Sequence, residues 1–177
     1  INFIVHGNGG IELRFAVERN ADMPWLPRFG IRLFLPKACD TAEYYGFGPD
    51  ESYCDKHHGS RLGLYQTSAA QNHEDYIKPQ ENGSHFGCEY VKLTDARGTG
   101  LCARLNAPFS FSLSPYTQEE LSEKAHNYEL AESGCTMLCL DYKQSGVGSN
   151  SCGPQLLERY RLNETNFTFT LFLNPLE

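Results

Sequence analysis

The chain has 177 residues, a formal net charge of −7 and 40% hydrophobic residues, a composition typical of a folded globular protein. A chain of this length can bury roughly 70% of its unfolded surface, so we expect one domain or a large part of one. The acidic balance disfavours nucleic acid as a partner. The sequence has no apolar run of about 18 residues, and its first ten residues lack the basic region and long apolar stretch of a signal peptide. We therefore expect a soluble protein without a membrane partner, either cytoplasmic or periplasmic.

Short β-strands dominate the predicted elements. Runs rich in apolar, aromatic or β-branched residues, each bounded by Gly, Pro, Asn or Asp, predict strands at residues 11–18, 31–36, 89–93, 101–106, 109–113, 135–142, 157–162 and 167–173. The alternation in 109–114 and 166–173 is typical of half-buried antiparallel strands. We therefore expect an all-β antiparallel sandwich with one short helix.

The helix is predicted within residues 114–133. Thr117 and Glu120 have the spacing of a capping box, and Leu121, Ala125 and Tyr128 recur on one helical face. We expect this amphipathic helix to lie against a sheet.

Residues 46–87 show little periodicity over a long stretch. Loops of this length are uncommon unless they are functional or packed against a neighbour, so this segment is predicted to form a contact surface.

The odd number of cysteines, seven, and their irregular spacing favour free thiols. Cys54-x-x-His57 and His85-x-x-Cys88 form a mirrored pair with a spacing found in zinc sites, and they are the candidate metal ligands. Neither pair is a C-x-x-C or an H-x-x-x-H, and ordinary loop histidines explain the pattern as well. We expect a fold that needs no metal.

The segment GVGSNSCGP, residues 146–154, lacks the third glycine of a dinucleotide loop and the Lys-Ser/Thr of a P-loop. Cys152 would need a nearby base to act as a nucleophile, and no local spacing supplies one. Glu119 and Glu123 share a helix face, but like charges there are typical of a solvated surface. The residues alone predict no complete catalytic site.

Four spaced motifs occur in one order: Tyr45–Asp55, Tyr76–Gly83, Tyr116–His126 and Gly146–Pro154. From Ile1 to Leu173 the chain resembles the C-terminal domain of the large β-galactosidases of glycoside hydrolase family 2. That domain begins upstream in the family, so residues 1–175 are expected to be one β-sandwich and the C-terminal portion of a larger domain. The dipeptide at 176–177 is typical of a cloning-site remnant.

The resemblance implies a supersandwich, the galactose-mutarotase-like β architecture, and a parent enzyme that is a retaining β-galactosidase. In the family the two catalytic glutamates and the active-site cations, Mg and Na, belong to a preceding (β/α)8 barrel. This chain is then an accessory domain without catalytic residues or a cofactor. Its expected partners are a β-galactoside sugar and the barrel of the same polypeptide, in a homo-oligomeric parent.

The resemblance also implies one sugar-facing loop. The family's counterpart of residues 146–154 reaches toward the barrel mouth, and Cys152 aligns where many members place a tryptophan that stacks on sugar. Asn150, Ser151, Cys152 and Gly153 are the substrate-binding candidates. Lys56 stands where the family usually has Arg.

The other motif residues have structural interpretations. We expect Glu51 and Glu81 to accept backbone hydrogen bonds, and Tyr45, Tyr53 and Tyr76 to be packed aromatics.

Two other functions fit an all-β chain. A free-standing aldose mutarotase or epimerase would need a histidine and a carboxylate in one cleft, and His85 with Glu81 or Glu51 would supply them. A non-catalytic carbohydrate-binding module is the second alternative.

Overall fold

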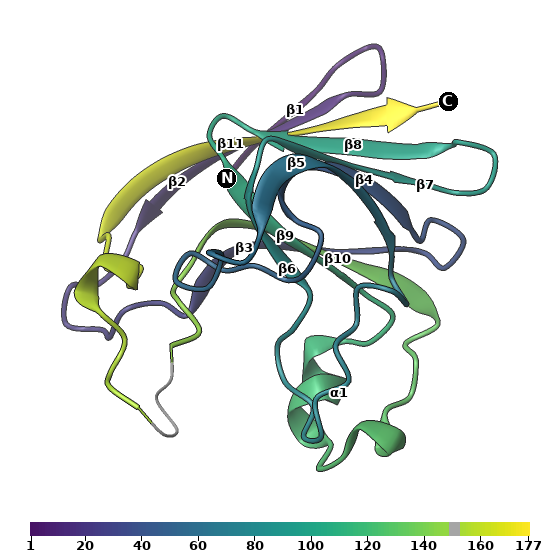
Figure 1. Ribbon diagram of the computed structural model, residues 1–177. Helices are drawn as coiled ribbons and strands as arrows, with labels where there is room; N and C mark the ends of the chain where they lie inside the picture. Colours follow the sequence, from purple (N-terminus) through teal and green to yellow (C-terminus); the bar gives the residue numbers. More distant parts are fainter. Residues whose placement is uncertain (149–152) are drawn as a thin grey trace.

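The protein is a sandwich of two antiparallel β-sheets, with long loops and a short helix gathered beyond one end of the smaller sheet (Figure 1). The computed structural model describes residues 1–148 and 153–177. The predicted all-β sandwich is confirmed.

The two sheets differ in width. In spatial order the larger sheet contains β1 (Asn2–Val5), β2 (Ile11–Glu18), β11 (Asn166–Leu176), β8 (Gly100–Leu105), β7 (Tyr90–Thr94), β4 (Thr41–Gly48) and β5 (Arg61–Ser68). The smaller sheet contains β3 (Arg28–Pro36), β10 (Cys135–Gln144), β9 (Phe109–Ser114) and β6 (Ser84–Cys88). The smaller sheet therefore covers only part of the larger one.

The core lies between the sheets and is rich in aromatic rings. Phe29 of β3 packs edge-on against Phe167 of β11, with ring centroids 5.1 Å apart. Tyr44 of β4 packs edge-on against Phe111 of β9 at 5.0 Å. Each buried ring contributes about 1.5–3 kcal/mol of apolar burial, and the ring pairs fix which strands face each other.

Most of the predicted strands are present, but the one at residues 157–162 is wrong. That segment is a 3₁₀ turn, Glu158–Tyr160, in which the Tyr160 amide bonds to the Leu157 carbonyl. Leu162 is buried while the turn itself is not, and the Leu26 amide donates to the Leu162 carbonyl. One buried leucine and an isolated β-bridge, rather than a pleated face, therefore hold the segment.

The prediction of a long unpatterned segment at 46–87 is also wrong in part, because it contains β5 and β6. In β5 the leucines Leu62 and Leu64 are 50% and 60% exposed, while Gly63 lies on the more buried face. The leucines of β5 therefore face solvent instead of the core, so the hydrophobic pattern of the sequence did not reveal this edge strand.

The helix is shorter than predicted. Thr117 caps α1 (Gln118–Glu123) as expected, and Leu121 is buried, but Tyr128 is 79% exposed. The Glu129 carboxylate accepts the amides of Ala125 and His126, which starts a separate 3₁₀ turn at Asn127–Glu129. No helix in the described ranges is long and apolar enough to span a bilayer.

Candidate functional site

The smaller sheet has a polar outer face that is also buried. Because Phe111 and Leu113 of β9 point into the core, the intervening Ser110 and Ser112 point to the other side. Ser112 is 6% exposed, and Asp141 of β10, on the same outer face, is 2% exposed. Loops and α1 cover this face, so its polar groups must find partners within the protein.

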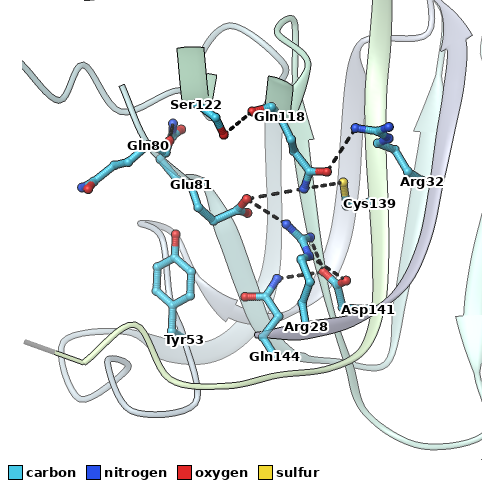
Figure 2. Close-up of polar contacts among 12 residues, drawn as sticks. Arg28, Arg32, Tyr53, Gln80, Glu81, Gln118, Ser122, Cys139, Asp141 and Gln144 are labelled. Carbon is cyan, nitrogen blue, oxygen red and sulfur yellow. Dashed lines mark hydrogen bonds and ion pairs between the residues drawn. The ribbon is translucent and has the colours of Figure 1, made fainter. Parts of the chain in front are cut away.

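Arg28 of β3 is the centre of these contacts (Figure 2). Its Nε donates to Asp141 Oδ1 at 3.0 Å and its Nη2 donates to Asp141 Oδ2 at 2.5 Å, a two-pronged ion pair. Its Nη1 donates to Glu81 Oε2 at 2.7 Å. One guanidinium thus ties the loop that carries Glu81 to two strands of the sheet.

Gln118 connects α1 to the same cluster. Its Nε2 lies 3.5 Å from Glu81 Oε2 and 3.5 Å from Cys139 Sγ, and its Oε1 accepts from Arg32 Nη1 at 3.3 Å (Figure 2). Gln144 Nε2 adds a bond of 2.7 Å to Asp141 Oδ2. The position of the helix is therefore set by side chains of the outer face.

The charged groups of this cluster hold one another in place. Burial acts to lower the pKa of Arg28, but Asp141 and Glu81 raise it overall, so the guanidinium stays charged. Burial raises the pKa of Glu81 although Arg28 opposes that change. Both carboxylates are held by the same cation, which leaves neither positioned as an independent acid or nucleophile.

The Glu51 carboxylate is the centre of a second cluster of hydrogen bonds, which joins three loop segments. Its carboxylate accepts from Lys56 Nζ at 2.6 Å, Tyr76 Oη at 2.5 Å, Gly83 N at 3.0 Å and Tyr53 Oη at 3.1 Å. Burial acts to raise the pKa of Glu51, but the bonds from Lys56, Tyr76 and Gly83 lower it overall. The backbone bond predicted for Glu51 is confirmed. The one predicted for Glu81 is wrong, because that carboxylate faces Arg28 and Gln118 across the sheet.

The base of the 146–154 loop is held by Asp55. Its carboxylate accepts from Val147 N at 3.0 Å and Gly148 N at 2.8 Å. A Cβ on Gly146 would lie 2.4 Å from this carboxyl group, and Gly148 has a φ of +60°. Both glycines are therefore required by the path of the backbone.

Three of the four predicted substrate-binding residues, Asn150, Ser151 and Cys152, lie outside the described residues. Gly153 lies in an exposed bend. The assignment of these residues to a sugar site stays a prediction.

A pocket of about 440 Å³ lies beside the base of this loop. Its lining combines the rings of Tyr142, Tyr160 and Phe86 with the cationic side chains of Lys143 and Arg159. Aromatic rings and charged side chains therefore lie beside the base of the 146–154 loop, the segment predicted from the sequence to face a sugar.

His85 does not form the cleft that a mutarotase would need. It is 1% exposed, its Nε2 pairs with Asn72 Oδ1 at 2.7 Å, and its Nδ1 pairs with Tyr44 Oη at 2.9 Å. Burial lowers the pKa of His85 to about 4. Its hydrogen-bond partners are therefore Asn72, Tyr44 and the Phe47 carbonyl, instead of Glu81 or Glu51.

The candidate zinc ligands likewise form other contacts within the protein. His57 Nδ1 pairs with the Tyr53 carbonyl at 2.9 Å, and Cys88 is buried with its thiol against the His85 carbonyl. Within residues 1–148 and 153–177, no group of three or more His, Cys, Asp or Glu could hold a metal ion. The six cysteines in these ranges are free thiols.

Sequence patterns did not find Arg28, Asp141 or the role of Asp55. Arg28 and Asp141 are 113 positions apart, and neither stands in a motif. Asp55 ends the Tyr45–Asp55 motif, and that was the available signal.

A family model described as beta galactosidase small chain matches residues 1–173. The chain is 54% identical over 167 residues to a β-galactosidase of Actinobacillus pleuropneumoniae, covering 94% of this chain and 16% of the relative. It is 40% identical to a β-galactosidase of Staphylococcus xylosus, with 98% and 17% covered, and 35% identical to β-galactosidase BgaC of Bifidobacterium adolescentis, with 86% and 15% covered. The chain thus spans about a sixth of the length of these curated relatives, and it belongs to the β-galactosidase small-chain family.

Proposed function

We propose that this chain is an accessory domain of a retaining β-galactosidase that hydrolyses terminal β-D-galactosides. The observation that carries the proposal is the family match over residues 1–173, in a chain that spans only a sixth of its β-galactosidase relatives. Catalysis then belongs to another domain of the same polypeptide. The free-standing mutarotase is not favoured, because His85 pairs with Asn72 and Tyr44.

The carboxylates of the candidate site support a non-catalytic role. A retaining glycosidase needs two carboxyl groups about 5–5.5 Å apart, one as nucleophile and one as acid and base. Asp141 and Glu81 are held by Arg28, and Glu51 accepts four hydrogen bonds. These groups stabilise loops, so the proposal places the catalytic glutamates, and the Mg and Na ions, in a barrel domain of a homo-oligomeric parent.

The contribution of this chain to the sugar site is the 146–154 loop. Asp55 fixes the base of the loop, and the aromatic rings and charged groups of both signs that line the neighbouring pocket suit the rim of a sugar site. We assign Asn150, Ser151, Cys152 and Gly153 to that rim. A thiol at 152 buries less area than an indole, so binding there should be weaker than with tryptophan by about 1–2 kcal/mol.

The test is Cys152→Trp and Cys152→Ser in the full-length enzyme, with Cys39→Ser as a matched control. We expect Cys152→Trp to change KM for lactose or an aryl galactoside by about 5- to 30-fold, as 1–2 kcal/mol requires, or to shift the hydrolysis-to-transglycosylation ratio. The control should leave both unchanged. Unchanged kinetics in both folded Cys152 variants would remove the loop from the sugar site.

A further inference from the structure

The outer face of the larger sheet carries a continuous row of side chains that crosses six of its strands. We call this set the outer row, and it consists of Glu12 of β2, Phe172 of β11, Arg104 of β8, Tyr90 of β7, Tyr45 of β4 and Leu64 of β5. Neighbours in this row are register partners, and the adjacent pair of Val91 and Ala103 sets Arg104 beside Tyr90. Leu171 and Tyr44, which alternate with them along the strands, are buried in the core, so the outer row points away from it.

The outer row exposes three aromatic rings. Phe172, Tyr90 and Tyr45 are each half-buried, and Leu64 at the end of the row is 60% exposed. Tyr90 is held by Lys92, whose Nζ lies 5.3 Å from the centre of the ring. Neighbouring strands are about 4.8 Å apart, so the row runs about 19 Å from Phe172 to Leu64. The smaller sheet and α1 lie on the other side of the larger sheet (Figure 1), and a line of partly exposed rings is typical of a binding surface.

A hollow of about 430 Å³ lies at the Phe172 end of the outer row. Its lining combines the Phe172 ring with the polar side chains of Arg104, Asn106 and Asn174. Arg104 and Asn174 are exposed, and an amide side chain both donates and accepts hydrogen bonds. A ring beside such groups suits a ligand that has an apolar face and hydroxyl groups, as a sugar has.

The charges around the outer row are largely paired with each other. The Lys92 ammonium lies 2.7 Å from the Glu43 carboxylate, and Arg14 Nε donates to the Glu12 carboxylate at 2.6 Å. The net charge of the whole chain, −7, repels polyanions. A neutral ligand is therefore favoured. A protein partner suits this face less well, because the core of a protein interface is depleted of charged residues, whereas Glu12 and Arg104 interrupt the apolar groups of the row.

We propose that the outer row binds an extended, neutral β-1,4-linked hexose chain that lies across the strands. Its sugar rings stack on Phe172, Tyr90 and Tyr45, since one face of a hexose presents C–H groups to the aromatic ring. Arg104 and Asn174 bind hydroxyl groups at the edge of the chain. A β-1,4 linkage gives a straight, ribbon-like chain that follows the row, whereas an α-1,4 linkage gives a chain that coils away from a sheet face. The proposal goes beyond the proposed function and does not depend on it.

The experiment is isothermal titration of the full-length protein that contains this chain with cellohexaose, a β-1,4-linked glucose chain without galactose. We expect saturable binding, and we expect α-1,4-linked maltohexaose to bind more weakly by about tenfold or more. Phe172→Leu keeps an apolar side chain but removes the flat ring, so it should weaken cellohexaose binding by about fivefold or more. Tyr90→Leu is the second variant if Phe172→Leu lowers the melting temperature below that of the assay. Tyr128→Leu removes a 79% exposed ring outside the outer row and is the matched control.

Footprinting tests whether the outer row is free in the full-length protein. Tyr45 and Phe172 should react with hydroxyl radicals in the absence of sugar and should be protected by cellohexaose. Protection without sugar would mean that another domain or a second copy covers the row, and the proposal would be wrong. Absent binding of cellohexaose, equal binding of maltohexaose, or unchanged binding in the two leucine variants of the row would also overturn it. None of these measurements reads hydrolysis, so their failure is distinct from a failure of the Cys152 substitutions.

Discussion

The Asp55 carboxylate accepts a hydrogen bond from the backbone amide of Gly148, 93 positions along the chain, with Oδ2 and N 2.8 Å apart. The same carboxylate accepts from Val147. Two amides that leave the end of β10 are thereby held by one charge on a different loop. This relationship fixes where the 146–154 loop departs from the sheet.

Asp55→Asn is expected to loosen the base of that loop. An amide side chain keeps one acceptor oxygen but turns its NH₂ group toward a backbone N–H, so one charge-assisted bond is lost. We expect faster hydrogen exchange at Gly148 and a loss of about 1 kcal/mol in the free energy of unfolding. Asp22→Asn, at an exposed aspartate, is the control. Unchanged exchange at Val147 and Gly148 would contradict the assigned anchor.

Arg28→Met is expected to be strongly destabilising, because it leaves the carboxylate of Asp141 buried at 3% side-chain exposure without its cation. Removing one partner of a buried ion pair costs about 3 kcal/mol or more. Urea denaturation gives the change in the free energy of unfolding. Arg14→Met, which breaks the exposed pair with Glu12, should cost less than about 1 kcal/mol.

A double-mutant cycle identifies the cause. Adding Asp141→Asn to Arg28→Met should recover part of the lost stability, because the buried charge is removed. If the two losses simply add, the pair is not coupled as the distances indicate.

His85 predicts how stability depends on pH. Its pKa in the folded protein is about 4, against 6.5 ordinarily, so the unfolded chain binds the proton first as the pH falls. Stability is therefore fully present above about pH 6.5 and is lost between about pH 6.5 and 4, by up to about 3 kcal/mol. The raised pKa of Glu81 acts in the opposite direction, since its folded form holds a proton at higher pH.

Because His85 and Glu81 change the stability in opposite directions as the pH falls, the contribution of His85 is measured by comparing variants. The free energy of unfolding of His85→Gln should vary less between pH 7 and 5 than that of the unmutated chain. His58→Gln, at an exposed position, is the control and should show the same change in the free energy of unfolding with pH as the unmutated chain. An unaltered slope in His85→Gln would show that His85 titrates normally.

The sequence predicted several strands whose pattern matches their burial, but it did not predict β1 (Asn2–Val5) or β4 (Thr41–Gly48). Residues 11–18 coincide with β2, where Leu13 and Phe15 are buried in alternation with exposed Arg14 and Ala16. β5 was missed because Leu62 and Leu64 face solvent at a sheet edge. A hydrophobic pattern reports burial, so it fails where leucines lie on the outside.

The candidate site was less predictable because its contacts join distant segments. Glu81 appeared as an acceptor for its own loop, yet it pairs with Arg28, 53 positions away. The Thr117 cap was predicted correctly because it is local, but the reciprocal bond of a capping box is not formed, since the Glu120 carboxylate accepts from the Ala131 amide. The end of α1 depends instead on Glu129, whose carboxylate accepts two amides. Local chemistry can be predicted from a sequence, but pairing across sheets requires the fold.

The most direct test of the accessory role is an assay of aryl β-galactoside hydrolysis by the isolated 177-residue chain and by the full-length protein that contains it. With both freed of host β-galactosidase, we expect turnover by the full-length protein and none by the isolated chain, because the proposed function places the two catalytic carboxyls in another domain. Turnover that copurifies with the isolated chain, and that is lost in its Glu81→Gln or Glu51→Gln variant, would contradict it.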